Sequence, residues 1–312
     1  MRRAGLAVAA VAALLVAILL AAARVGERPG ALSDWQALVL GVVQGLTELL
    51  PISSSGHLIL VPWLAGWTYL EEHPDFNKTF DVALHLGTLV AVVAYFRATI
   101  AELIAAWVGS IRHRRIEAPS ERLAWLVAVA TVPAAIVGAA GQDVIEERLG
   151  EPWQIALLLA VFGAVLWLAD RLPQRKGLAG LTFPGALAVG IAQSAALAPG
   201  VSRSGVTITA ARLLGLDRDA AARLSFLLLV PVVFGASLLT GLQDIVFGDL
   251  PAGWAGPFVV GTIAAAVTGF AAIWALLGYL RRHDYSLFVY YRLVVAAVVL
   301  LLIATGAKDA TF

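Results

Sequence analysis

Long apolar segments recur along the chain, separated by short polar connections. A helix needs about 20 apolar residues to cross a bilayer, and segments of this kind predict seven membrane helices. They lie near residues 5–23, 80–96, 122–141, 153–169, 223–241, 253–280 and 286–305. The pattern therefore predicts an all-α polytopic membrane protein.

Two further apolar regions, residues 35–66 and 181–215, are each interrupted by proline, glycine and serine residues and do not read as simple spans. Basic clusters mark cytoplasmic connections by the positive-inside rule. These clusters are Arg112/Arg114/Arg115, Arg171/Arg175/Lys176 and Arg281/Arg282, and the acidic connections are Asp143–Glu151 and Asp244–Asp249. The resulting orientation makes the first region a re-entrant hairpin open to the outside, and the second one open to the cytoplasm.

The two interrupted regions also resemble each other. Five residues recur unchanged 149 positions later: Gly41, Gln44, Ser53, Ser55 and Gly56 match Gly190, Gln193, Ser202, Ser204 and Gly205. Each hairpin is followed by three spans, so we expect two inverted halves, about 33–170 and 178–305, within one domain of residues 31–312. Broken helices that meet near the membrane midplane build polar sites in such folds. The alternative is chance similarity in an Ala/Gly/Leu-rich chain.

The N-terminal residues 1–30 form a separate hydrophobic segment. We expect a retained extra helix there, and a cleaved signal peptide is the alternative. Composition supports the membrane assignment, since 60% of the 312 residues are hydrophobic, 14% are charged and the mean hydropathy is +0.87. The net charge of +1 gives no reason to expect nucleic acid, and the absence of cysteine excludes disulfides and thiolate metal sites.

The first hairpin carries several chemically active side chains. Gln44 and Glu48 are four residues apart and share a helical face. A carboxylate at membrane depth needs a partner, which could be a metal ion, an arginine or a hydroxyl that it activates; a carboxylate capped by nearby hydroxyls is the structural alternative. Residues 53–55 could cradle phosphate oxygens. Alternatively, one of these serines could be a nucleophile with His57 or Glu48 as its base.

The second hairpin carries the features of an anion site. Arg203 lies deep in an apolar segment between Ser202 and Ser204. A guanidinium binds phosphate in a bidentate manner, and the following helix offers its positive N-terminal end. A structural ion pair of Arg203 with Glu48 is the alternative, and the two interpretations are compatible. Weaker candidates are Asp81 and His85, which share a helical face, while Arg292 is expected to snorkel or to pair helices.

These two motifs together resemble the undecaprenyl-diphosphate phosphatases of the bacitracin-resistance type. The resemblance covers roughly residues 33–305 and rests on two segments: Gln44-x-x-x-Glu48 with Pro51 and Ser53-Ser54-Ser55-Gly56-His57, and Pro199-Gly200-Val201-Ser202-Arg203-Ser204-Gly205. It implies hydrolysis of undecaprenyl diphosphate to the monophosphate and inorganic phosphate, which recycles the carrier of cell-wall precursors. The N-terminal 30 or so residues have no counterpart in the usual short members.

The resemblance also implies roles for individual residues. Glu48 would lie at the catalytic centre and bind a divalent cation, Mg²⁺ or alternatively Ca²⁺, with Gln44 as a second ligand. Ser54 would be the nucleophile or a phosphate ligand, His57 would transfer protons, and Arg203 would hold the diphosphate. The remaining substrate-binding residues would be Ser53, Ser55, Ser202, Ser204, Gly205 and Thr207.

The expected partners are the lipid substrate and the bacterial inner membrane, with the active site toward the outer face and a homodimer left open. One alternative is the acid-phosphatase-like membrane phosphatases, but these need a histidine where this chain has Thr209. Another is a polyprenyl-lipid transporter that uses the same polar site, because fold alone does not imply function.

Overall fold

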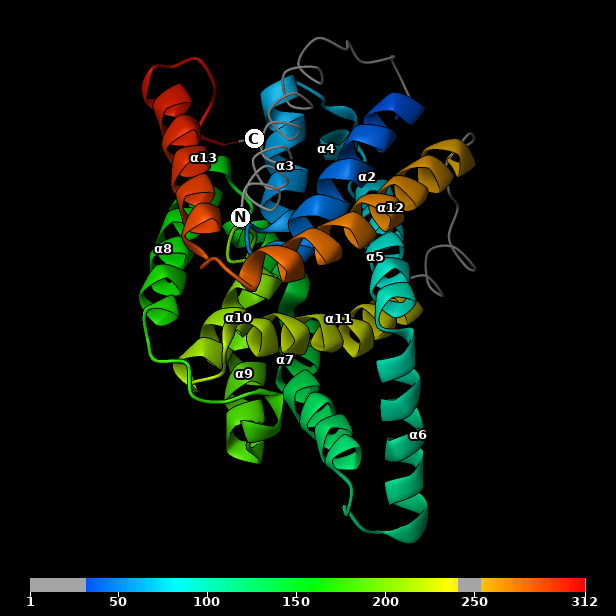
Figure 1. Cartoon of the computed structure of the whole chain (residues 1–312). Coiled ribbons are helices and arrows are strands. Elements are labelled where there is room, and N and C mark those ends of the chain that lie inside the picture. The colour runs from blue at the N-terminus through cyan, green and yellow to red at the C-terminus, as the bar shows by residue number, and fades with distance from the viewer. Residues whose placement is uncertain (1–31, 241–253, 312) are drawn as a thin grey trace.

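A computed structural model describes residues 32–240 and 254–311 of the chain, and within these ranges its regular secondary structure is helical (Figure 1). The predicted N-terminal helix at residues 1–30 lies outside the described residues. An isolated bridge between Lys176 and Leu216 is the β-type pairing found in the described part.

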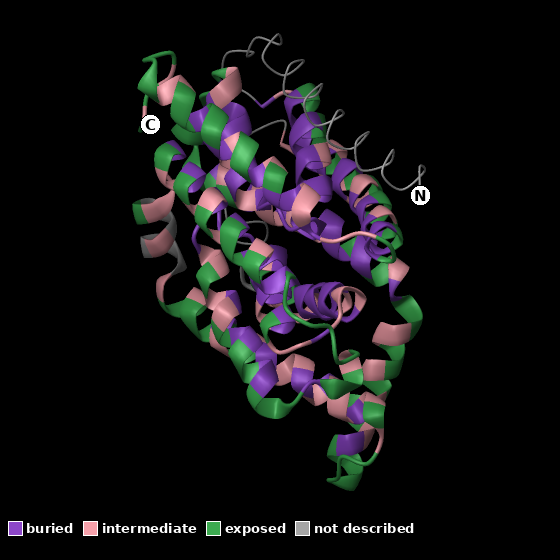
Figure 2. Ribbon diagram, turned by 60° about the vertical axis from the view of Figure 1, so that its left-hand side comes forward, coloured by how far each residue is buried: buried purple, intermediate pink, exposed green. Residues whose placement is uncertain are grey.

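Six helices are long and apolar enough to span a membrane, which confirms the six spans predicted after residue 80. They are α5 (Pro74–Tyr95), α7 (Pro119–Leu149), α8 (Pro152–Asp170), α11 (Arg218–Thr240), α12 (Ala255–Leu280) and α13 (Ser286–Ala304). Their outward faces carry large exposed apolar side chains such as Ile136, Trp274 and Leu301. Figure 2 shows the buried residues gathered in the interior and the exposed ones on the outer helix faces. An apolar outer surface is what a lipid environment requires.

Each interrupted region forms a pair of short helices joined by a break. The first pair is α2 (Asp34–Leu49) and α3 (Ser54–Ala65), and the second is α9 (Phe183–Ser194) and α10 (Arg203–Leu213). The two members of each pair pack against each other, so both regions are helical hairpins, as predicted. That the two hairpins open to opposite faces of a membrane stays a prediction.

Two features of the first half differ from the sequence-based expectation. A separate helix, α6 (Arg97–His113), follows α5 directly. Helix α7 continues beyond its predicted end at residue 141 as far as Leu149, with non-helical backbone at Gly141. The acidic residues near 143–147 therefore belong to a helical extension, and their assignment to a connecting loop was wrong. The short elements α4 (Tyr69–Glu72), η1 (Leu178–Gly180) and η2 (Ala195–Leu197) complete the described chain.

Repeated glycines let the hairpin helices approach neighbouring spans closely. A Cβ added to Gly41 on α2 would lie 2.3 Å from the carbonyl oxygen of Gly261 on α12. A Cβ added to Gly190 on α9 would lie 2.5 Å from the carbonyl oxygen of Ala130 on α7. Small residues allow such close backbone contacts between membrane helices. Each hairpin is thus held against a span from the other half of the chain.

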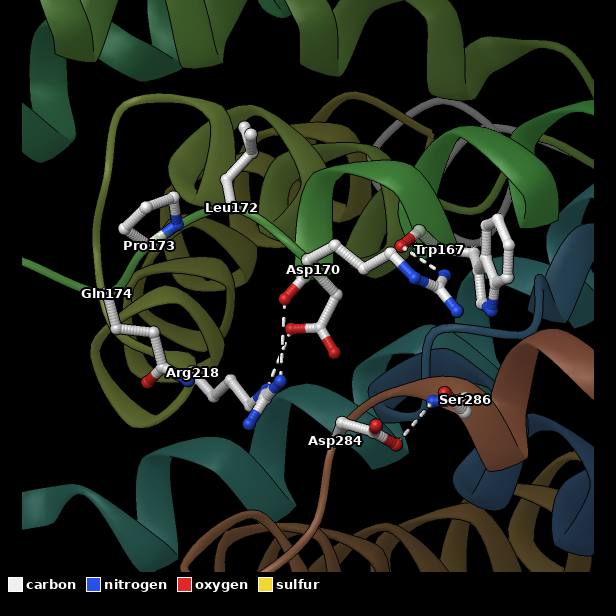
Figure 3. A pocket seen from close by; sticks show the side chains of 9 residues that line it. Trp167, Asp170, Leu172, Pro173, Gln174, Arg218, Asp284 and Ser286 are labelled. Atoms are coloured by element: carbon white, nitrogen blue, oxygen red, sulfur yellow. Dashed lines mark hydrogen bonds and ion pairs between the residues drawn. The ribbon is translucent and has the colours of Figure 1, made fainter.

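A buried carboxylate ties several helix ends together away from the hairpin breaks. Asp170 accepts hydrogen bonds from the Arg212 Nε at 3.2 Å, the Arg218 Nε at 2.8 Å and the Tyr285 backbone N–H at 3.0 Å. Figure 3 shows Asp170 and Arg218 facing each other. Both residues line a hollow of about 400 Å³. Burial and the Asp170 carboxylate raise the pKa of Tyr285, so its phenol stays protonated and donates to the Arg218 carbonyl. This cluster joins α8, α10, α11 and the turn before α13.

Candidate active site

The two helical breaks have the same unusual backbone. Ser53 has φ 75° and ψ 98°, and Ser202, 149 residues later, has φ 76° and ψ 113°. Non-glycine residues rarely adopt positive φ, and such strain gathers at functional sites. Each serine caps the helix that follows it, because its hydroxyl accepts the backbone N–H of the glycine three residues on, Gly56 or Gly205. The N-termini of α3 and α10 are therefore fixed at the breaks.

The two breaks also hold each other. The backbone N–H of Gly200 in the second break donates to the Ser53 hydroxyl in the first, at 3.1 Å. In return, the Ser204 hydroxyl donates to the Leu50 carbonyl at 2.9 Å. These reciprocal bonds join segments about 150 residues apart in sequence. The hydroxyls of Ser53, Ser202 and Ser204 are thus engaged in building the breaks, and their predicted contact with substrate stays a prediction.

Glu48, at the end of α2, lies at the centre of the site. Its side chain is only 4% exposed and accepts a hydrogen bond from the Arg203 Nε at 3.1 Å. Its second oxygen accepts from the Ser54 hydroxyl and lies 3.4 Å from the Gln44 Nε2. The His85 Nε2 on α5 is 3.6 Å from the same oxygen. The structure therefore brings together four of the predicted site residues from both hairpins, Gln44, Glu48, Ser54 and Arg203, with His85 beside them.

Two buried polar atoms at this centre have no partner in the described part of the chain: the Arg203 Nη2 and the Gln44 Oε1. Buried polar groups are nearly always hydrogen-bonded, so each atom is suited to a ligand. The other terminal nitrogen of Arg203 donates to the Ser225 carbonyl at 2.9 Å, which fixes the guanidinium. A free guanidinium donor beside a serine hydroxyl can hold a phosphate oxygen.

The predicted divalent cation can be compared with these donors. Within residues 32–240 and 254–311, no cluster of three His, Cys, Asp or Glu side chains suits a metal ion. Mg²⁺, however, is commonly held by one or two carboxylates together with substrate phosphates. The Glu48 carboxylate and the unpartnered Gln44 Oε1 are oxygen donors of that kind. The residues present therefore fit a cation that binds together with the diphosphate.

His57, on α3, is turned away from the Ser54–Glu48 pair. Its Nδ1 lies 2.6 Å from the Ser53 carbonyl oxygen, and its Nε2 lies 2.8 Å from the Tyr291 hydroxyl. Both ring nitrogens are thus already paired. The predicted transfer of protons by His57 stays a prediction, and in this arrangement the base that touches Ser54 is Glu48.

Arg292, on α13, is buried between the two hairpin breaks. Of the two expectations for it, snorkelling was wrong, because the side chain is fully buried, and helix pairing is confirmed, because its Nε donates to the Leu159 carbonyl on α8 at 3.0 Å. It donates to the carbonyls of Gly200 at 2.9 Å, Val201 at 3.1 Å and Pro51 at 3.4 Å, and so contacts both breaks. No sequence motif predicts that an arginine will bind backbone carbonyls. An arginine within an apolar span does, however, indicate that the side chain has a specific partner inside the protein.

The remaining predicted residues lie around the centre. Thr207 is fully buried, and its hydroxyl is 2.8 Å from the Ser225 hydroxyl on α11, a neighbour that the sequence did not single out. Gly205 lies against Arg292, since an added Cβ would be 2.9 Å from the Nη1. Ser55 is partly exposed at the start of α3.

Comparisons with known proteins point to one family. The family model described as "Bacitracin resistance protein BacA" matches residues 37–298. An undecaprenyl-diphosphatase of Pelobacter propionicus is 45% identical over 272 residues, covering 86% of this chain and 97% of the relative. Undecaprenyl-diphosphatases of Thermomicrobium roseum and Geobacter sulfurreducens are each 47% identical, over 86% and 85% of this chain and 98% and 96% of the relatives.

Proposed function

The chain belongs to the bacitracin resistance protein family of undecaprenyl-diphosphatases, and we propose that it performs this hydrolysis at the centre formed by Glu48, Ser54 and Arg203. The observation that carries the assignment is a serine hydroxyl donating to a buried carboxylate, beside an arginine with a free donor. This set supplies a nucleophile, a base and a phosphate ligand. Transport without chemistry is not favoured, because the curated relatives are named as the enzyme.

The reaction begins with Ser54. Its Oγ attacks the terminal phosphorus while Glu48 takes the hydroxyl proton, and the bond from that phosphorus to the bridging oxygen breaks. Undecaprenyl phosphate leaves with the bridging oxygen and receives the proton from Glu48. Water then attacks the phosphoserine, Glu48 accepts a proton from the water, and that proton returns to Ser54 as inorganic phosphate departs. A base in contact with the nucleophile is the requirement for this kind of catalysis.

Arg203 binds the diphosphate. Its Nη2 is free, while its Nε and Nη1 are fixed by Glu48 and the Ser225 carbonyl. In phosphoryl transfer, catalysis is largely positioning and charge stabilisation, and a guanidinium held on two sides is already positioned. The N-terminus of α10, at which Arg203 stands, adds favourable electrostatics for an anion.

A divalent cation, Mg²⁺ or Ca²⁺, would be held by Glu48 and Gln44. It would supply positive charge to neutralise the diphosphate oxygens. The Gln44 Nε2 already lies beside Glu48, which leaves its Oε1 free for this purpose. The side chain of Gln44 therefore presents its oxygen toward a ligand and its nitrogen toward the carboxylate.

The covalent step leads to a prediction for Ser54→Ala. We expect phosphate release from undecaprenyl diphosphate to fall at least about 10³-fold, because the nucleophile is absent. Acid quenching of wild-type protein with substrate labelled in the terminal phosphate should trap label on Ser54. The matched control is Ser194→Ala, whose hydroxyl donates to the Gly190 carbonyl within its own helix. Substantial turnover by Ser54→Ala would show that water attacks directly.

The cation leads to a separate prediction. Removing divalent ions with a chelator should abolish turnover, and added Mg²⁺ should restore it. Replacing Gln44 with leucine should raise the Mg²⁺ concentration needed for half-maximal rate by about tenfold, the range found when a metal-site partner is lost. Full activity in excess chelator would remove the cation from the scheme.

We propose that the protein lies in the bacterial inner membrane with this site toward the outer face. The distribution of basic connections supports the orientation of the spans, and the membership of the family supports the face of catalysis. The polyprenyl tail would stay in lipid between helices while the diphosphate enters the breaks. The protein is a multi-pass membrane protein. Whether it acts as a homodimer can be measured by light scattering of the purified protein in detergent.

A further inference from the structure

Tyr291 on α13 contacts the first hairpin, although it is 234 residues away from it in sequence. Its hydroxyl lies 2.8 Å from the His57 Nε2, and the two rings are nearly parallel, with centroids 5.6 Å apart and planes 16° apart. The neighbouring Tyr290 is 60% exposed on the outer surface of the same helix. The sequence did not single out Tyr291 as a site residue, and the mechanism above does not use it.

The hydrogen bonds of His57 define its protonation pattern. The Nδ1 lies 2.6 Å from the Ser53 carbonyl oxygen, which can only accept, so Nδ1 carries a hydrogen and donates. In a neutral ring the Nε2 then has a lone pair, and the Tyr291 hydroxyl donates to it. The hydrogen bond made by one ring nitrogen thus decides the state of the other.

The Ser53 carbonyl matters because it belongs to the peptide unit that leads to Ser54. Ser53 has the unusual φ of 75°, so this peptide plane needs support from its surroundings. The His57 ring Nδ1 donates to the carbonyl at 2.6 Å beside the backbone N–H of the same residue at 3.2 Å, while the Gly200 N–H holds the Ser53 hydroxyl. A rotation of this plane would move Ser54 away from Glu48.

We propose that Tyr291 is a positioning residue for the hydrolysis, and that it acts through His57 to hold the Ser53–Ser54 peptide and thereby direct the Ser54 hydroxyl to Glu48. The proposal rests on the function assigned to Ser54 above. In this proposal His57 orients the peptide, since both of its ring nitrogens are hydrogen-bonded. The Nδ1 donates to a carbonyl, which cannot relay a proton. Arg292, the next residue, supports the same break through the Pro51 carbonyl.

The test uses Tyr291→Phe, which keeps the stacked ring and removes only the hydroxyl, with Tyr290→Phe as the matched control. We expect Tyr291→Phe to lower kcat about tenfold, the effect of one lost hydrogen bond at the reacting serine. KM should change less than twofold, because Arg203 still holds the diphosphate. Tyr290→Phe should keep both constants. Unchanged kcat in Tyr291→Phe would overturn the proposal.

A double-mutant cycle separates positioning through His57 from a general structural role. If Tyr291 acts through His57, adding Tyr291→Phe to His57→Ala should cause no further loss of single-turnover rate. An additional tenfold loss would contradict the proposal, because it would show that the hydroxyl acts independently of the imidazole.

The last measurement does not depend on turnover, so it distinguishes failure of this proposal from failure of the assigned reaction. Wild-type protein with ¹⁵N-labelled histidine should show the His57 ring as the single Nδ1–H form, with assignment by its disappearance in His57→Ala. Tyr291→Phe should weaken the hydrogen bond from the His57 Nδ1–H to the Ser53 carbonyl, seen as an upfield shift and faster solvent exchange of the Nδ1 proton, and Tyr290→Phe should not. An unchanged Nδ1 proton resonance in Tyr291→Phe would overturn the proposal even if the enzyme hydrolyses its substrate as described.

Discussion

Replacing Arg203 with alanine should lower the rate of phosphate release from undecaprenyl diphosphate by about 10³-fold or more. An arginine that stabilises the charge of a transferring phosphoryl group contributes about 10³–10⁵ in rate. Arg203 is placed for this task because its Nη2 is free and its other donors are fixed. Purified protein in detergent with Mg²⁺, assayed for inorganic phosphate, measures the effect.

Stability must be measured beside activity, because Arg203→Ala leaves the Glu48 carboxylate buried without its ion-pair partner. Breaking a buried pair in this way costs about 3–5 kcal/mol. Arg203→Lys keeps the charge and loses the planar fork, so it should fold and retain a small fraction of the activity. Arg223→Ala, which removes a partly exposed pair with Asp219, is the matched control and should stay active. A folded, fully active Arg203→Ala protein would refute the site.

Glu48→Gln is expected to abolish detectable turnover, with a loss of about 10²–10⁴-fold for the missing base. Glutamine has nearly the same shape; its single amide oxygen can still accept from the Arg203 Nε, and its amide nitrogen then donates to the Ser54 hydroxyl oxygen. The substitution therefore removes the proton acceptor and one cation ligand while it leaves the packing intact. Trapping with labelled substrate should yield no phosphoserine.

The control for this substitution is Glu102→Gln on the exposed face of α6, which makes the same chemical change far from the hairpin breaks in sequence. We expect that variant to hydrolyse substrate at the wild-type rate. If Glu48→Gln instead turned over normally in the presence of Mg²⁺, Glu48 could not be the base, and His85, 3.6 Å away, would be the nearest candidate to replace it.

Hydropathy predicted most of the fold because lipid imposes a simple rule on the spans. The predicted segments near 153–169 and 286–305 agree with α8 and α13 to within a residue or two. Helix α6 escaped prediction because it has only 17 residues and carries Arg97, Glu102 and Arg112, so it offers no uninterrupted apolar run of spanning length. The extension of α7 was missed because the charged residues after residue 141 were taken to end the helix. Charged residues end only the part of a helix that lies in lipid, and the helix itself can continue.

The centre of the site was predictable for a different reason. Glu48 and Arg203 are charged residues inside apolar segments, where burying an unpaired charge costs free energy, so each needs a partner. Their pairing could therefore be expected from the sequence. The contacts of Arg292 with backbone carbonyls and of Tyr291 with His57 could not, because they depend on how the last helix packs against both breaks. Every residue has a backbone carbonyl, so the pattern of side chains does not reveal which carbonyls accept a hydrogen bond from a distant residue.

The position of Arg292 has a consequence for how the protein is made. The Pro51 carbonyl and the guanidinium that it binds are 241 residues apart. A ribosome adding 5–20 residues per second needs roughly 10–50 s to cover that distance. During this interval the first hairpin is in the membrane without its final support, and the nascent enzyme has no assembled catalytic centre. Completion of the last helix is therefore the step that matures the newborn chain, and a nascent chain truncated before α13 should insert but remain inactive.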